Sequence, residues 1–138
     1  MKKLFVPFEI ACLLKNKNFN KKCVAYYTTN FITSTLKYVN SKTDGKLMFC
    51  RNNKFPPLYD QNISAPIHQQ VIDWLKEKHN LYIIEQIDMT CEPKYCYEIY
   101  KYEDFGNWTL VSKRPDMFLY SNSINNLDSA IKEALTLI

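Results

Sequence analysis

The sequence predicts a small α+β fold in which antiparallel strands pack against three helices. Three stretches carry apolar residues at helical spacing, and the tyrosines cluster between them in short runs typical of strands. A chain of 138 residues with 46% apolar content can bury one core, because a domain of this size removes roughly two-thirds of its unfolded surface from water. We therefore expect a single domain, residues 1–138, with the order α-β-β-β-α-β-β-β-α.

The first helix is predicted over residues 7–17. Pro7 is tolerated in a first helical turn. Asn18 predicts a left-handed stop, with Phe19 folding back onto the last turn. One helical stripe holds the apolar residues Val6, Ile10, Leu13 and Leu14.

Three strands are expected next, over residues 24–27, 31–39 and 46–51. Asp44-Gly45 supplies the residues that a tight turn requires, which predicts pairing of the last two. Residues 52–63 are rich in Asn and Pro and predict a loop. This loop is a candidate subdomain break, but each half would be very small, so a crossing loop inside one domain is preferred.

The second half begins with a helix that Ser64 is expected to cap, with Pro66 in its first turn and its end near Asn80. Three antiparallel strands are predicted after it, over residues 81–87, 95–102 and 108–113, the last two joined by a turn at residues 104–107. A final helix is expected over residues 125–137, because its apolar residues repeat at helical spacing.

Charge is laid out unevenly along the chain. Residues 1–59 hold 11 Lys and Arg against two acids, a net of +9, while residues 60–138 hold 7 against 12 acids, a net of −5. Several lysines crowd the predicted end of the first helix, where they either complement the helix dipole and solvate the surface or form an anion-binding patch. The candidate anion or partner contacts are Lys15, Lys17, Lys21, Lys22, Lys46 and Arg51.

The sequence holds no recognisable catalytic, cofactor or metal motif. Gly45 and Gly106 are its only glycines, so no phosphate-binding loop exists. We expect a protein that is not an enzyme and has no cofactor. Cys91 and Cys96 could begin a zinc site, but no second close Cys/His pair completes it, and buried or idle thiols are the simpler expectation.

The five cysteines are odd in number and irregularly spaced, which is typical of a reducing cytoplasm. No stretch approaches the roughly 20 apolar residues of a membrane span. We expect a cytoplasmic protein without membrane contact.

Four segments carry a resemblance: residues 5–11 (FVPFEIA), 23–27 (CVAYY), 65–75 (APIHQQVIDWL) and 130–135 (AIKEAL). The chain resembles a family of small proteins without assigned activity from Bacteroidetes and their phages, crAss-like phages included. The resemblance implies an origin in such a phage or its host, and a host-cytoplasm or virion location. It implies no functional residues.

Two functions remain open on the sequence. The first is a binding protein, a phage or host accessory factor that docks on a protein partner or on its own copies, because opposite charges and abundant Tyr suit interfaces. The alternative is a nucleic-acid-binding accessory protein that uses its basic N-terminal half. Further phosphate contacts would then be Lys37, Lys42 and Lys54, and the stacking rings would be Tyr26, Tyr27 or Tyr38.

Overall fold

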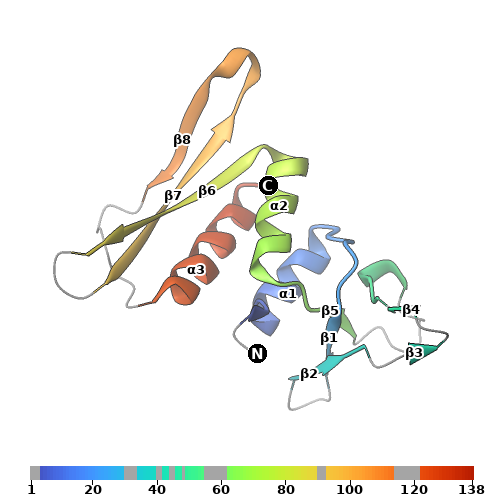
Figure 1. Cartoon of the computed structure of the whole chain (residues 1–138). Helices are drawn as coiled ribbons and strands as arrows, with labels where there is room; N and C mark the ends of the chain where they lie inside the picture. The colour runs from blue at the N-terminus through green and yellow to red at the C-terminus, as the bar shows by residue number, and fades with distance from the viewer. Residues whose placement is uncertain are drawn as a thin grey trace. The chain divides into compact units, whose positions relative to one another are not determined.

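The computed structural model describes residues 4–29, 34–39, 42–43, 46–47, 49–54, 62–89, 93–113 and 122–138. These residues form three helices and two antiparallel three-stranded sheets in the order α-β-β-β-α-β-β-β-α, which confirms the predicted α+β fold (Figure 1). A short antiparallel pair, β3 (Lys42–Thr43) with β4 (Lys46–Leu47), is inserted in chain order between strands of the first sheet. Residues 44–45, where the sequence predicted a turn, lie outside the described residues.

The chain falls into two compact units, Met1–Gln70 (unit 1) and Val71–Ile138 (unit 2). Their border lies inside helix α2 (His68–His79). The predicted loop at residues 52–63 lies largely outside the described residues, and the expectation of one domain stays a prediction.

Unit 1 opens with α1 (Phe8–Asn16). The predicted stop is confirmed: Asn18 has a φ of 61°, and the N–H of Phe19 donates to the Leu14 carbonyl at 2.9 Å. The buried face consists of Ile10, Ala11 and Leu14. Leu13, which was expected on this face, is exposed, because a residue turned 100° from Leu14 falls at the edge of a stripe centred on the other three.

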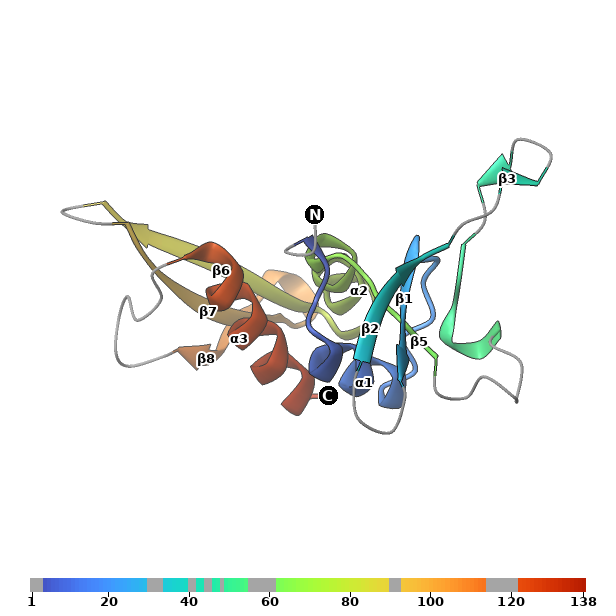
Figure 2. The same cartoon turned by 90° about the horizontal axis from the view of Figure 1, so that it is seen from below.

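The sheet of unit 1 has the order β2-β1-β5, with β1 at Ala25–Thr29, β2 at Ser34–Tyr38 and β5 at Ile63–Ser64 (Figure 2). The predicted partner of the second strand was wrong, since β2 pairs with β1 and not with residues 46–51. Only residues 30–33 separate β1 from β2, so their pairing closes a much shorter loop. It also sets Tyr27 opposite Leu36 against the buried apolar cluster of unit 1.

Helix α2 begins later than predicted. Ser64 does not cap it, because Ser64 lies in β5 opposite Tyr26. The extended chain instead continues to Ile67, whose N–H donates to the side-chain oxygen of Gln70 at 3.2 Å. A residue inside the first turn thus provides the cap by reaching back.

Unit 2 holds β6 (Leu81–Asp88), β7 (Lys94–Tyr102), β8 (Trp108–Lys113) and α3 (Ser123–Thr136), each within two residues of its prediction. The strands form one antiparallel sheet in chain order, and α3 lies along one of its faces (Figures 1 and 2). The Glu133 carboxylate joins helix to sheet, since it accepts hydrogen bonds from the hydroxyls of Tyr97 and Ser112.

Within the described part of the chain, every helix is too short or too polar to cross a membrane.

Candidate functional site

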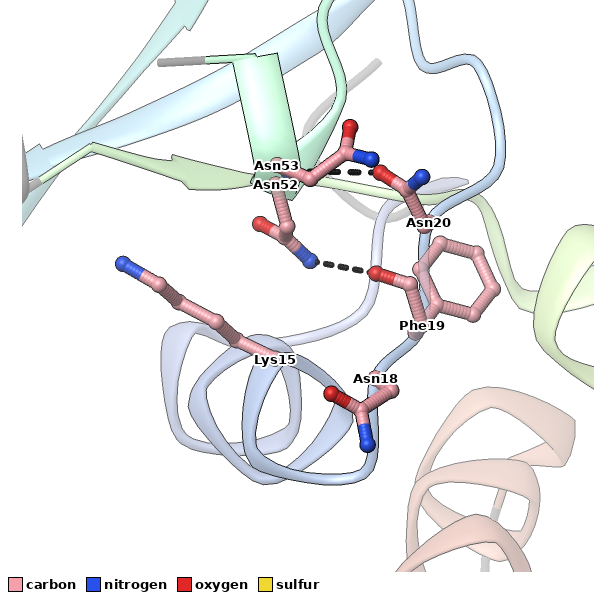
Figure 3. Close-up of a pocket in the computed structure, with 6 residues that line it drawn as sticks. All are labelled: Lys15, Asn18, Phe19, Asn20, Asn52 and Asn53. Atoms are coloured by element: carbon pink, nitrogen blue, oxygen red, sulfur yellow. Dashed lines mark hydrogen bonds between the residues drawn. The ribbon is translucent and has the colours of Figure 1, made fainter. Parts of the chain in front are cut away.

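A pocket of about 340 Å³ lies in unit 1 beside the C-terminal end of α1 (Figure 3). Two stretches of chain build it, the residues that end and follow α1 and the 3-10 turn η2 (Asn52–Lys54). We call it the asparagine pocket. Its lining consists of Lys15, Asn18, Phe19, Asn20, Asn52 and Asn53.

Asn52 holds the two stretches together. Its amide nitrogen donates to the Phe19 carbonyl at 2.8 Å, and its amide oxygen accepts from the Ser64 N–H at 2.9 Å. A second link runs from the Asn53 N–H to the side-chain oxygen of Asn20 at 3.3 Å (Figure 3). Within the described residues, Asn18 and Asn53 donate hydrogen bonds through their backbone N–H groups and not through their side-chain amides.

Most of the predicted basic residues lie on these same two stretches. Lys15 lines the pocket, and Lys17 caps the helix just before Asn18. Lys21 and Lys22 follow Asn20, and Arg51 precedes Asn52. Lys46 is not brought to the pocket by any described contact: it lies in β4, and its side chain is outside the described residues.

Cys23 and Cys50 join the stretch after α1 to the stretch before η2. Their backbones exchange two hydrogen bonds, each 2.9 Å from nitrogen to oxygen. Both thiols are buried, and burial raises the pKa of Cys23 to about 12 and also raises the pKa of Cys50. Neither side chain is a thiolate nucleophile near neutral pH.

The opposite side of this bridge faces solvent, because side chains alternate along an extended backbone. Val24 and Phe49 are 45% and 44% exposed there, and the Lys22 ammonium lies 5.6 Å from the centre of the Phe49 ring. We call this surface the basic–apolar patch. It consists of Lys22, Val24, Phe49 and Arg51.

The tyrosines proposed as stacking rings have different surroundings. The hydroxyl of Tyr27 donates to the Val6 carbonyl at 2.7 Å, and its half-buried ring packs against the buried cluster. Tyr38 packs edge-on against Phe5 and is exposed, while Tyr26 is half-buried. Lys37 lies opposite Tyr26 in the sheet, and the side chains of Lys42 and Lys54 are outside the described residues.

The change of charge sign coincides closely with the structural division. Unit 1 carries 11 Lys and Arg against 3 acids, a net of +8, and unit 2 carries 7 against 11, a net of −4. Unit 1 is therefore net basic and unit 2 is net acidic.

The closed end of the β7–β8 hairpin is a surface that sequence reasoning missed. Phe105 is fully exposed there (101%) and has a φ of 64°, a left-handed conformation that costs a bulky residue about 1–2 kcal/mol. Glu103 and Asp104 precede it, and both are exposed. We call residues 103–108 the hairpin tip. The signal was an aromatic residue at a turn position where Gly, Asn or Asp is usual.

Aromatic rings continue from the tip onto the sheet face that α3 does not cover. Trp108 is 51% exposed and makes edge-on contacts with Tyr82 at 4.6 Å and Tyr102 at 5.0 Å between ring centroids. The Lys76 ammonium lies 5.3 Å from the Tyr82 ring centre. These contacts fix the Trp108 ring while leaving half of its surface in water.

No group of three or more His, Cys, Asp or Glu within the described residues could hold a metal ion. Cys96 is buried in β7, and Cys91 lies outside the described residues.

Comparison with protein-family models, curated proteins and solved structures finds no match for this chain. The resemblance to small phage and Bacteroidetes proteins therefore stays a prediction.

Proposed function

We propose that this chain is a binding protein without catalytic activity that docks on a protein partner through the hairpin tip. The supporting observation is Phe105, whose ring is fully exposed on a backbone conformation that costs free energy. Folding gains nothing from a large apolar ring in water. A strained and exposed aromatic residue is instead typical of a position held ready for a binding partner.

The surroundings of Phe105 define the partner's chemistry. Trp108 adds a second aromatic surface that its neighbours already hold in place, so little side-chain entropy is lost on binding. Glu103 and Asp104 favour basic neighbours. The partner is therefore a protein surface with an apolar recess bordered by Lys or Arg. Taken with the predicted resemblance, such a protein serves as an accessory factor of a phage or its host.

Selection from a displayed random-peptide library tests this proposal. We expect the selected peptides to combine apolar residues with Lys or Arg. Their affinity should fall at least tenfold for the Phe105→Asn variant, because Asn accepts the same backbone conformation but removes the ring. Leu4→Asn, which changes an exposed apolar residue of unit 1, is the matched control. Peptides that bind both variants like the unmodified protein would contradict the proposal.

A second candidate function is favoured by the gathering of basic residues at the asparagine pocket. Lysine and arginine side chains contact phosphates, and asparagine amides pair with base edges. Lys15, Asn18 and Asn53 bring both kinds of group to one pocket. This supports binding of single-stranded nucleic acid by unit 1.

Fluorescence anisotropy with labelled oligothymidine and oligouridine tests the second candidate. We expect affinity to fall steeply with salt, and to fall further in the Lys21→Glu, Arg51→Glu double variant. Lys78→Glu with Lys94→Glu makes the same change in net charge on exposed residues of unit 2 and is the control. An affinity that is unchanged between low and high salt would exclude phosphate contacts as its source.

A further inference from the structure

The basic–apolar patch has the chemistry that the hairpin tip requires of a partner. The patch sets two half-exposed apolar side chains and a lysine around the Cys23–Cys50 bridge, and the half-buried Arg51 follows Cys50 in the chain. The tip sets two exposed aromatic rings beside two carboxylates. The two surfaces are thus complementary in both charge and polarity, and they belong to units of net charge +8 and −4.

We propose that a second copy of this chain is a partner of the tip: the hairpin tip of one copy docks on the basic–apolar patch of the next. This inference rests on the proposed docking function and adds the identity of the occupant. In the contact, Phe105 packs against Val24 and Phe49. Its flanking carboxylates, Glu103 and Asp104, approach the cations of Lys22 and Arg51.

Joining two different surfaces makes the contact heterologous. Each copy that has docked its tip still offers its own patch, so association continues beyond the dimer unless a ring closes. Both surfaces are small, and interfaces well below about 1,200 Å² are typical of weak, transient complexes. The expected behaviour is therefore an average mass that rises with concentration and passes twice the 16.4 kDa of the chain.

Light scattering coupled to size exclusion, with sedimentation as a second measurement, tests the inference on the unmodified full chain. Protein between about 1 µM and about 1 mM covers the range of weak association. We expect the rise in mass to be weaker at roughly 0.3 M salt than at roughly 0.05 M salt, because charge pairs at an exposed rim are screened. The Phe105→Asn variant should need at least tenfold more protein to reach the same average mass.

A charge exchange between the surfaces identifies the contact. One variant carries Glu103→Lys and Asp104→Lys, and a second carries Lys22→Glu and Arg51→Glu. Each should be monomeric alone, because its own tip and patch repel. On mixing, the basic tip of the first meets the acidic patch of the second, and association should return.

The control is the Lys78→Glu, Lys94→Glu variant, which matches the net charge of the patch variant but leaves both surfaces intact and should associate like the unmodified protein. A monomer at every concentration overturns the inference, as does a mixture of exchanged variants that stays monomeric. Peptides that bind in a Phe105-dependent manner to a monomeric protein would leave the docking function standing and reject only the second copy. If neither Phe105-dependent peptide binding nor self-association is observed, the docking function is rejected as well.

Discussion

Two turns in this molecule contain a residue in the left-handed conformation, and they differ in whether a phenylalanine ring is buried or exposed. In unit 1, Asn18 takes the positive φ and Phe19, the next residue, folds inward and is completely buried. In unit 2, Phe105 itself takes the positive φ and its ring lies entirely in water. Asn80, with a φ of 54°, repeats the first arrangement at the end of α2, where the following Leu81 is buried.

This difference distinguishes turns whose residues stabilise the fold from a turn whose residue does not. The turns at Asn18 and Asn80 combine a side chain that tolerates the left-handed conformation with an apolar neighbour that closes the core. The turn at Phe105 has neither advantage. Stability and surface chemistry should therefore respond in opposite ways to changes at the two phenylalanines.

The largest effect is expected from removing the buried ring. Phe19→Ala should lower the free energy of unfolding by about 3–5 kcal/mol, since it opens a cavity in the core and removes a wall of the asparagine pocket. Phe105→Ala should lower it by no more than a few tenths, because the ring has no core contacts to lose. Urea unfolding measures both. Equal losses would mean that the tip is packed in solution.

The side chain of Asn52, which lies outside the Asn18–Phe19 turn, also stabilises this turn. Asn52→Ala should cost about 1–3 kcal/mol, because the Phe19 carbonyl and the Ser64 N–H lose their partner. Asn53→Ala is the matched control, since only the backbone of Asn53 donates a hydrogen bond among the described residues. If both variants melt at the same temperature, Asn52 does not link the two stretches as described.

The buried side of unit 1 predicts that the free energy of unfolding falls at alkaline pH, an effect that an exposed turn cannot produce. Burial raises the pKa of Cys23 from its ordinary value of 9.0 to about 12, so between these values the folded chain keeps a proton that the unfolded chain releases. Stability from this thiol is complete below pH 9 and is lost as pH rises toward 12, at up to about 1.4 kcal/mol per pH unit. Cys23→Ala should show a flatter decline in urea unfolding between pH 8 and 10. An identical decline in both proteins would show that Cys23 ionises as in water.

The smallest effect has the opposite sign. Phe105→Asn should raise the free energy of unfolding by about 0.5–1 kcal/mol, because asparagine occupies the left-handed region at lower cost. Gly106→Ala provides the contrast: a methyl group there meets nothing within 4 Å, yet the φ of +82° opposes it, so this variant should be destabilised. Calorimetry resolves both changes. A tip that becomes less stable on Phe105→Asn would contradict the description of this turn as strained.

The sequence foretold the elements whose signals are local. The left-handed stop at Asn18, the end of α2 near Asn80, the three strands of unit 2 and the final helix depend on periodicity and on turn chemistry within a few residues. The pairing of β2 with β1 was not predicted, because the turn signal at residues 44–45 indicated residues 46–51 as the partner of β2. Several strands can compete to pair with the same strand, and one local turn signal does not decide which pairing forms.

The candidate site shows the same limit. The lysines after α1 were found because they crowd one stretch of sequence. The Cys23–Cys50 bridge joins the stretch that holds Arg51 to the stretch that holds these lysines. The spacing of residues along the sequence does not predict this bridge. Asn52 was not singled out, since its role depends on two backbone groups far away in the chain. Phe105 was read as part of an ordinary turn, because exposure and φ are properties of the folded backbone.

Helix α2 begins in one unit and ends in the other, with their border between Gln70 and Val71. A cleavage at this border would leave Gln70, whose side chain caps the helix start, on one fragment and most of the helix on the other. Isolated halves would therefore each need a complete copy of residues 67–79. Fragment complementation, limited proteolysis and any exchange of halves between related chains have to respect a shared helix instead of a linker.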